Sequence, residues 1–315
     1  MDHLLTLDGL SGSDIERIFN QARTMKRARA AGQPTKPLLA GKTVALLFEK
    51  PSLRTRVSFE VAARELGATS LYLSPQEVGL GTRESVADVA RVLSGYVHAV
   101  VLRTFSHATV EEFARCASIP VINGLTDAHH PCQGLTDLYT ITEHFGSLDG
   151  RVLAYVGDGN NVAHSLIQAA AKRGMRVRIA TPPGFEPDAG LLALAQAEAV
   201  TVGAQVMLMH DPFAAVDGAD VVYTDVWTSM GQESEANSRR AVFAPYQVNA
   251  SLVAHAAPHA IVMHPLPAHR GQEVTDDVLD GPQSRVFIQA ENRLHVQKAI
   301  LRELVGMEER VTLTA

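Results

Sequence analysis

The chain has few cysteines, one tryptophan and an excess of acidic over basic residues. Two of its 315 residues are cysteine, and 28 lysines and arginines stand against 34 aspartates and glutamates, which gives a formal net charge of -6. Two cysteines, Cys116 and Cys132, form no disulfide framework and suit a reducing compartment. The acidic balance argues against a nucleic-acid partner, because such binding depends on neutralising phosphates.

Long apolar runs are absent as well. No run approaches the roughly 20 apolar residues of a membrane span, and Met1-Asp2-His3-Leu4 lacks the basic flank and apolar stretch of a signal peptide. We therefore expect a cytoplasmic protein without a membrane partner. Its length and its 46% of hydrophobic residues suffice for a large core in one or two domains, with no need of disulfides or a structural metal.

Hydrophobic periodicity predicts an α/β protein. A first helix is predicted from its apolar face and from Ser13 and Glu16, which have capping-box spacing. That face consists of Ile15, Ile18, Phe19, Ala22 and Met25. A Gly/Pro-rich connector at 32–37 ends this element.

Two series of strands follow, separated by helical patterns. Strands are predicted at 43–48, 69–73, 99–102 and 120–123, and then at 152–156, 177–180, 205–209, 221–224 and 261–264. Helices are predicted near 53–66, 84–94, 109–116 and 132–145, and a last one runs from Glu291 to about Leu304. Apolar strands alternating with helices indicate parallel sheets covered on both faces.

We therefore expect two doubly wound parallel-sheet domains linked by helices. Residues 1–148 form the first domain and residues 149–290 the second, with Asp149-Gly150 as the joint. The C-terminal helix, 291–315, is expected to pack back on the first domain. Ligands of such sheets bind beyond the carboxyl ends of the strands, so the polar residues that follow each strand are the candidates for function.

A phosphate-binding pattern follows the first strand. Pro51 presets a turn and Ser52 caps the next helix. The free N–H groups of the helix start, the hydroxyls of Ser52 and Thr55, and the guanidiniums of Arg54 and Arg56 suit phosphate oxygens. The alternative is a capped helix with solvated arginines.

Two further groups follow the third and fourth strands. Arg103 at a strand end is, by itself, typical of a surface ion pair. His130 and Gln133 open a long helix, where they either donate to a ligand oxygen or cap the helix. Cys132 beside His130 could act as a nucleophile, but a thiol inside a helix start more often serves as a small packing residue.

The second series carries polar groups after three strands. The turn Gly157-Asp158-Gly159 suggests a dinucleotide fingerprint, but Val162 stands where its third glycine belongs, which argues against a nicotinamide-dependent oxidoreductase. Asn160 and Asn161 instead offer amides to a polar substrate. Asp225 is suited to hold a cationic amine, or else caps the next turn.

A proline-rich loop follows the last strand. Pro265 and Pro267 fix its backbone, which suits the presentation of carbonyl groups to a ligand. His264 and His269 could indicate a metal, but no carboxylate or cysteine cluster with ligand spacing accompanies them. We therefore predict no metal site.

Taken together, these segments resemble the aspartate/ornithine carbamoyltransferase family, and they occur in the family's order. Residues 52–56 match its Ser-x-Arg-Thr-Arg signature, and Ser229-Met230-Gly231 resembles the ornithine-type site, which the aspartate enzymes lack. The resemblance assigns carbamoyl phosphate to Ser52, Leu53, Arg54, Thr55, Arg56, Arg103, His130, Pro131, Cys132 and Gln133. It assigns the amino acid to Asn161, Asp225, Ser229, Met230, Pro265, Leu266 and Arg293.

The resemblance implies transfer of a carbamoyl group from carbamoyl phosphate to the δ-amine of ornithine, giving citrulline and phosphate for arginine biosynthesis. It implies a homotrimer or a multiple of trimers and requires neither metal nor organic cofactor. Arg103, His130 and Thr55 would stabilise the carbonyl oxygen, and Pro265 would present its carbonyl to the amine. An inactive paralogue is a further alternative.

Two departures from the family pattern bear on these expectations. Pro265 stands where ornithine enzymes carry a cysteine, as is typical of the aspartate enzymes, so aspartate, putrescine or an acylated ornithine stays an alternative substrate. A carboxylate side chain of aspartate would, however, be repelled by Asp225. Gly79 aligns with a glutamine that reaches a neighbouring subunit's phosphate site, and Arg83 or loop backbone would replace it.

Overall fold

The computed structural model describes residues 1–306. Within them the chain forms two compact units, one made of residues 1–135 and the segment that begins at Asn292, the other of Thr136–Glu291. The last helix begins at Val286, earlier than the pattern predicted. Residues 307–315 of the predicted C-terminal helix lie outside the described residues. No helix within residues 1–306 is long and apolar enough to span a membrane.

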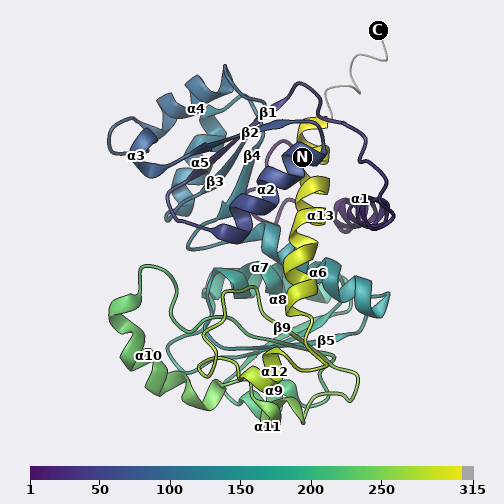
Figure 1. Ribbon diagram of the computed structural model, residues 1–315. Coiled ribbons are helices and arrows are strands. Elements are labelled where there is room, and N and C mark those ends of the chain that lie inside the picture. The colour runs from purple at the N-terminus through teal and green to yellow at the C-terminus, as the bar shows by residue number, and fades with distance from the viewer. Residues whose placement is uncertain (307–315) are drawn as a thin grey trace. The chain divides into compact units, whose positions relative to one another are not determined.

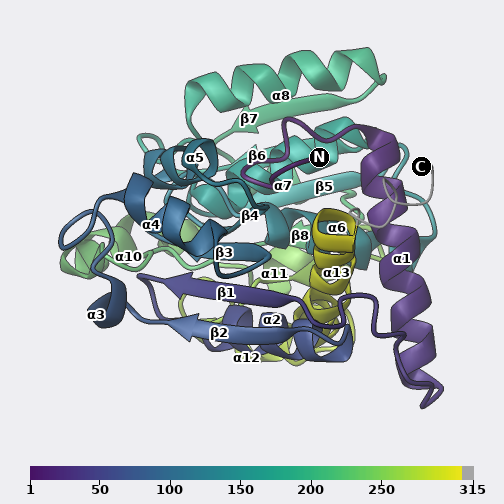
Figure 2. The ribbon, with the colours of Figure 1, turned by 90° about the horizontal axis from the view of Figure 1, so that it is seen from above.

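The first unit contains a four-stranded parallel sheet in the order β2-β1-β3-β4 (Figure 2). Its strands are β1 (Thr43–Phe48), β2 (Thr69–Leu73), β3 (Ala99–Arg103) and β4 (Val121–Leu125). Its helices are α1 (Gly12–Ala30), α2 (Leu53–Glu65), α3 (Pro75–Val78), α4 (Val86–Ser94) and α5 (His107–Cys116), with the start of α6 (Pro131–Phe145) and most of α13 (Val286–Val305). Helices α4 and α5 lie on one face of the sheet and α2 on the other (Figure 1). Every residue of β3 is buried, as expected of a strand covered on both faces.

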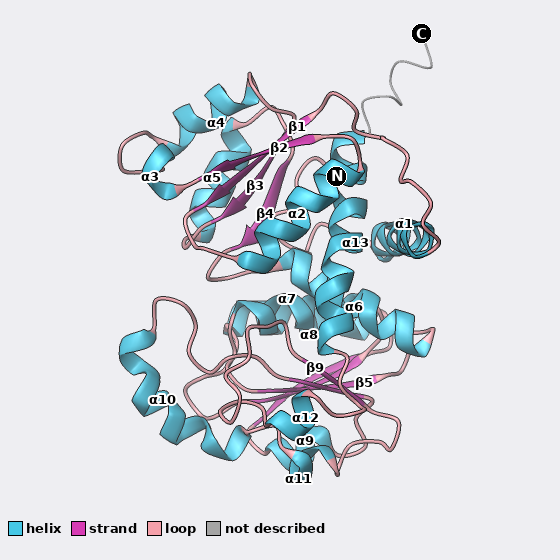
Figure 3. Cartoon of the chain, viewed as in Figure 1, coloured by secondary structure: helices cyan, strands magenta, loops and turns pink. Residues whose placement is uncertain are grey.

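The second unit contains a five-stranded parallel sheet in the order β7-β6-β5-β8-β9. Its strands are β5 (Val152–Val156), β6 (Arg176–Ala180), β7 (Gln205–Met209), β8 (Val221–Tyr223) and β9 (Ile261–Met263). Its helices are α7 (Asn161–Lys172), α8 (Ala189–Thr201), α9 (Pro212–Val216), α10 (Ala236–Phe243), α11 (Ala250–Val253) and α12 (Asp276–Leu279), with the 3-10 turns η1 (Glu233–Glu235) and η2 (Ala244–Tyr246). Figure 3 shows α7 and α8 on one face of this sheet and α9, α11 and α12 on the other.

These observations confirm the predicted α/β fold with two doubly wound parallel sheets. The apolar face predicted for the first helix is buried as expected. The predicted cap is wrong: Ser11, rather than Ser13, caps α1. The Ser11 hydroxyl accepts from the N–H of Asp14 at 3.1 Å, and the Asp14 carboxylate accepts from the N–H of Ser11 at 3.0 Å. An aspartate at the third helical position thus does what a glutamate usually does in this motif.

Each sheet has one point at which the strand order reverses. The reversal lies between β1 and β3 in the first sheet, where Phe48 pairs with Arg103. It lies between β5 and β8 in the second, where Tyr155 pairs with Tyr223. Ligands of open α/β sheets bind beyond the carboxyl ends of strands at such a switch point. The residues that follow these four strands are therefore the candidates for function.

A close backbone approach explains the second glycine of the turn after β5. A Cβ atom on Gly159 would lie 2.2 Å from the backbone nitrogen of Pro187 and 2.7 Å from the carbonyl oxygen of Phe185. The N–H of Gly159 donates to that same carbonyl at 2.9 Å. This glycine therefore allows the close contact between two segments of the second unit.

We predict that Gly159→Ala lowers the free energy of unfolding by about 1–3 kcal/mol, because the added methyl group must displace backbone. Urea denaturation of the two proteins measures the difference. Gly9→Ala is the matched control, since a Cβ there meets nothing within 4 Å. Equal small losses for both variants would contradict the steric explanation.

Candidate active site

The start of α2 lies at the switch point of the first sheet, and Ser52 caps it as predicted. The Ser52 hydroxyl accepts from the backbone N–H of Thr55 at 3.2 Å and donates to the Thr55 hydroxyl oxygen at 3.0 Å. Thr55 is buried, whereas Leu53 is 75% exposed. The cap thus fixes the two hydroxyls side by side at the positive end of the helix dipole.

Arg293, from α13, joins these hydroxyl groups. Its Nη2 donates to the Thr55 hydroxyl oxygen at 2.7 Å, and its Nη1 donates to the side-chain oxygen of Gln133 at the start of α6. On the same helix, the buried Lys298 ammonium pairs with Glu65 of α2 at 2.8 Å. The structure therefore groups Arg293 with two predicted carbamoyl-phosphate residues, although the resemblance placed it on the amino-acid side. No local pattern could have indicated this, because Arg293 is far from both in the sequence.

Three arginines, Arg54, Arg103 and Arg293, lie near enough for their positive charges to interact, and we call them the Arg103 cluster. Arg103 is 5% exposed, and burial, followed by the charges of Arg293 and Arg54, lowers its pKa to about 9. Burial and the same cations, with Arg103, hold the pKa of His130 well below its usual value. The Nε of Arg103 is buried without a hydrogen-bond partner. At neutral pH the site therefore combines charged guanidiniums with a neutral imidazole, which is an arrangement that an anion would stabilise.

The alternatives for Arg103 and Cys132 can now be decided. Arg103 makes no ion pair with any residue from 1 to 306, and its side chain is buried, so the surface ion-pair reading is wrong. Burial raises the pKa of the Cys132 thiol to about 12, and the thiol contacts the carbonyl oxygen of Asn123 at 3.5 Å. A thiolate nucleophile is therefore excluded at neutral pH. Pro131, buried as well, begins α6.

Two predicted residues are engaged elsewhere in the first unit. Arg56 pairs with Glu60 at 2.9 Å, and its guanidinium lies 3.7 Å from the centroid of the Tyr72 ring. Arg83 is exposed and donates to the carbonyl oxygen of Glu77 at 2.5 Å. Neither arginine is brought into contact with the Arg103 cluster, so their predicted roles at the phosphate site stay predictions.

Asp225 lies at the switch point of the second sheet, just after β8. It is buried, and its carboxylate accepts from the side-chain amide of Asn160 at 2.8 Å. Asn160 also caps α7 through the N–H groups of Val162 and Ala163, and Asn161 is the first residue of that helix. Burial raises the pKa of Asp225. A buried carboxylate is suited to bind a cation.

The loop after β9 is held by its own histidine. The N–H of Leu266 donates to Nδ1 of His264 at 2.9 Å, and Leu266 has a φ of 59°, which is rare outside glycine. The Nε2 of His264 lies 3.2 Å from the buried carboxylate of Glu273. Since Nδ1 accepts, the ring hydrogen lies on Nε2 and points at Glu273. The sequence analysis missed Glu273, because the spacing of these residues matches no ligand motif.

A buried polar network connects the two loops of the second unit. The hydroxyl of Tyr223, two residues before Asp225, donates to Asp137 of α6 at 2.9 Å. The side-chain amide of Gln289 donates to Asp137 at 2.7 Å, and its oxygen accepts from the N–H of His264 at 2.9 Å. Sequence reasoning missed Asp137 and Gln289, since both fall on apolar helical patterns without any motif.

The remaining predicted amino-acid residues differ in exposure. Met230 is 44% exposed, Ser229 is half-buried, and the N–H of Ser229 donates to the side chain of Gln232 at 3.1 Å. Pro265 is buried. Among the described residues, no group of three or more histidines, cysteines or carboxylates could hold a metal ion.

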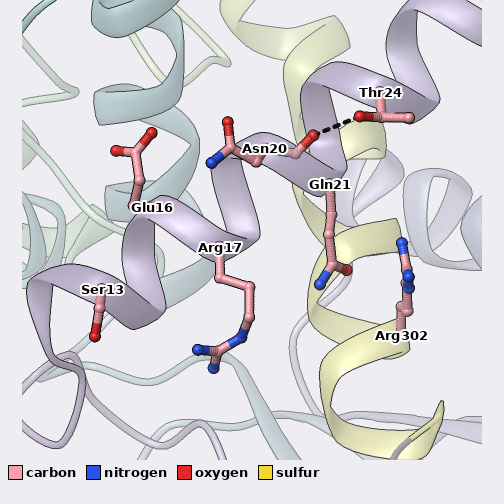
Figure 4. A pocket seen from close by; sticks show the side chains of 7 residues that line it. All are labelled: Ser13, Glu16, Arg17, Asn20, Gln21, Thr24 and Arg302. Carbon is pink, nitrogen blue, oxygen red and sulfur yellow. Dashed lines mark hydrogen bonds between the residues drawn. The ribbon is translucent and has the colours of Figure 1, made fainter.

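A cavity of about 590 Å³ lies between α1 and α13 (Figure 4). It is lined by Ser13, Glu16, Arg17, Asn20, Gln21, Thr24 and Arg302. Arg17 is already paired with Asp14 at 2.6 Å and with Glu303 at 2.7 Å. The arginine of α1 in this pocket is therefore already paired, and we assign the pocket no ligand.

The two switch points define an α/β protein with a buried guanidinium, that of Arg103, in one unit and a buried carboxylate, that of Asp225, in the other. Residues 2–143 match the aspartate/ornithine carbamoyltransferase carbamoyl-P binding domain, and residues 149–304 match the Asp/Orn binding domain of the same family. The chain belongs to the aspartate/ornithine carbamoyltransferase family. This membership confirms the resemblance and overturns the alternative of a nicotinamide-dependent oxidoreductase.

Similar proteins extend over nearly the whole chain. The ornithine carbamoyltransferases of Thermococcus kodakarensis and Bacillus subtilis are 52% and 53% identical, with 96% of this chain and 96% and 93% of theirs covered. The solved structure of the Pyrococcus furiosus ornithine carbamoyltransferase has a TM-score of 0.94 at 52% identity and covers 96% of this chain and 97% of its own. The anabolic enzyme of Campylobacter jejuni has a TM-score of 0.91 at 37% identity, with 96% and 99% covered.

We predict that Arg103→Gln weakens the binding of inorganic phosphate by about 10- to 150-fold, the loss expected for a charged hydrogen bond. Isothermal titration calorimetry measures both affinities. Arg91→Gln, an exposed arginine paired with Asp88 on α4, should leave the affinity unchanged. Equal affinities of wild type and Arg103→Gln would show that the cluster is not the anion site.

Proposed function

We propose that this protein transfers the carbamoyl group of carbamoyl phosphate to the δ-amine of L-ornithine, giving L-citrulline and phosphate for arginine biosynthesis. The observation that carries the proposal is the buried guanidinium of Arg103, which lies near enough to Arg54 and Arg293 for their positive charges to lower its pKa. Relatives at about half identity are named ornithine carbamoyltransferase, and that of Pyrococcus furiosus is named anabolic.

In this proposal residues 1–148, with the C-terminal helix, bind carbamoyl phosphate. Ser52, Arg54 and the start of α2 hold the phosphate group, because a helix N-terminus and a guanidinium both favour an anion. Arg293 orients Thr55 and Gln133 through the two hydrogen bonds described above. Leu53, Arg56, Pro131 and Cys132 complete the predicted set.

The reaction itself needs oxyanion stabilisation. The amine nitrogen attacks the carbamoyl carbon, negative charge grows on the carbonyl oxygen, and the bond to the phosphate oxygen then breaks. Arg103, His130 and Thr55 donate to that oxygen. The Thr55 hydroxyl accepts from Arg293 and Ser52, so its own hydrogen can point to the substrate. One such preorganised donor lowers the barrier by about 2.7–4 kcal/mol.

Residues 149–290 bind the amine in this proposal. Asp225 attracts the δ-ammonium, the carbonyl groups of Pro265 and Leu266 accept from it, and Asn161, Ser229 and Met230 contact the rest of the amino acid. The amine must lose a proton before it attacks, since its ordinary pKa is close to that of lysine, about 10.4. The phosphate group of the bound carbamoyl phosphate, before it departs, is a base that the reaction itself supplies for this proton.

The charge of Asp225 favours ornithine over aspartate as the acceptor. A second carboxylate beside the buried Asp225 would be repelled, and the raised pKa of Asp225 shows that its surroundings already disfavour negative charge. Putrescine and acylated ornithine keep the amine but lack the free amino-acid group that the Ser229-Met230 segment would contact.

We also propose that the active protein is a homotrimer and acts in the cytoplasm. The family resemblance supports the trimer. The exposed apolar side chains of Leu53 and Val57 on α2 would gain cover in such an assembly. Free thiols at Cys116 and Cys132 suit a reducing compartment.

We expect a panel of amine acceptors at fixed carbamoyl phosphate to give the highest kcat/KM with L-ornithine. Asp225→Asn should raise the KM for ornithine at least tenfold while changing the KM for carbamoyl phosphate less than twofold. Steady-state kinetics with citrulline detection measures both. Higher activity with aspartate, or equal effects on both KM values, would contradict the assignment.

The pH dependence provides a second readout of the same residue. Burial raises the pKa of Asp225 above its ordinary 3.8, so its carboxylate is neutralised, and ornithine binding weakens, as the pH falls through that raised value. The acid limb of kcat/KM for ornithine should therefore flatten in Asp225→Asn. It should persist in Asp149→Asn, a control on an exposed turn.

Light scattering should give a mass of about 102 kDa for the trimer, three times the chain mass of 33.9 kDa. A concentration-independent mass near 34 kDa in an active sample would contradict the trimer.

A further inference from the structure

A buried arginine outside the predicted site ties together two segments of the second unit. Arg239 of α10 is 8% exposed. Its Nη1 donates to the carbonyl oxygen of Trp227 at 3.0 Å and lies 3.2 Å from the carboxylate of Asp158. Its Nε donates to Glu235 at 3.0 Å, and the guanidinium lies 5.0 Å from the Phe185 ring.

The partners of Arg239 lie next to the proposed amine-binding residues. Trp227 is between Asp225 and Ser229, in the segment that follows β8. Asp158 is in the turn after β5, two residues before Asn160. One guanidinium therefore connects the two segments that leave the switch point of the second sheet, and the bond from Asn160 to Asp225 connects them a second time.

Stability alone does not explain this ion pair. The surroundings are apolar: the Trp227 and Phe243 rings stack at 5.9 Å, and Phe185 contacts Phe243 at 4.8 Å. Burial raises the pKa of Asp158 to about 6 in spite of Arg239, so the charged form of Asp158 is disfavoured there. Packed hydrophobic side chains are often at least as stable as a buried ion pair, whose geometry is instead specific.

The two ends of the Trp227–Met230 segment differ in exposure. Trp227 is 3% exposed, whereas Met230 is 44% exposed. The contact with Arg239 thus fixes the start of the segment and leaves its far end accessible to a ligand.

We infer that Arg239 is a positioning residue for the amine substrate: by holding the Trp227 carbonyl and Asp158 together, it sets the geometry of Ser229 and Met230 relative to Asp225. The inference rests on the proposed function for the identity of the amine. Arg239 touches no substrate in this account and acts only through the segment that it holds.

The test compares Arg239→Met and Arg239→Lys with Arg240→Met, its exposed neighbour on the same helix. Arg239→Met should raise the KM for ornithine at least tenfold and change the KM for carbamoyl phosphate less than twofold. Arg239→Lys keeps the charge but lacks the several N–H donors of the guanidinium. Its KM for ornithine should lie between those of Arg239→Met and wild type. Arg240→Met should match wild type in both constants.

Trp227 is the single tryptophan of the chain, so its fluorescence reports on the segment directly. Its emission should shift to longer wavelength in Arg239→Met, as water reaches the ring, and stay unchanged in Arg240→Met. An unchanged ornithine KM in a folded Arg239→Met protein, or equal increases for both substrates, would overturn the inference.

If Arg239→Met does not fold, Asp158→Asn and Arg239→Lys decide the question by the same two measurements. Unchanged ornithine KM and emission in both would overturn the inference. Failure of the proposed function gives a different result, because wild type would then not use ornithine at all. The KM comparison would in that case use the best amine of the panel, and the Trp227 emission needs no substrate.

Discussion

The feature on which the first unit depends is the buried positive charge of Arg103. Within residues 1–306 no carboxylate pairs with Arg103 at the end of β3, and the positive charges of Arg54 and Arg293 lower its pKa. Because like charges repel, the Arg103 cluster is stabilised when an anion binds to it. The chain compensates by anchoring the arginines from different elements, since α13 is fixed to α2 through Lys298 and Glu65. An anion site of this kind is therefore a property of the whole unit rather than of one loop.

The second unit contains a buried carboxylate, that of Asp225. Asp225 is stabilised by the side-chain amide of Asn160. Other buried polar groups hold the neighbouring residues: Asp137 and Gln289 bond to Tyr223 and His264. Arg239 bonds to the Trp227 carbonyl. The buried polar residues thus fix the positions of the loops that follow β8 and β9. Hydrogen bonds are directional, so apolar packing would not fix these positions in the same way.

Much of this architecture follows from sequence patterns, because strand alternation with helices and the switch-point rule are local and topological. Ser52, Arg103 and Asp225 could be identified because each lies at or shortly after the carboxyl end of a strand. Glu273, Asp137 and Arg239 were not, because their roles depend on contacts with residues far away in the sequence. The predicted start of α1 was wrong because Ser11 and Ser13 are both suitable capping residues. Only the hydrogen bond from the Ser11 N–H to the Asp14 carboxylate shows that Ser11 is the cap. Arg293 was found by resemblance alone, and its contact with Thr55 could be seen only in three dimensions.

The proline that replaces the usual cysteine at position 265 is compatible with amine binding for a structural reason. The conformation of its loop is set by the bond from the Leu266 N–H to His264 and by the contact of His264 with Glu273, and neither bond uses the side chain at 265. In the proposed function residue 265 presents its carbonyl group to the substrate, and proline keeps that group. In the proposed function Asp225 then selects a cationic over an anionic acceptor, because burial strengthens the electrostatic interactions of its carboxylate. A motif typical of aspartate enzymes can therefore occur in a site whose electrostatics favour an amine.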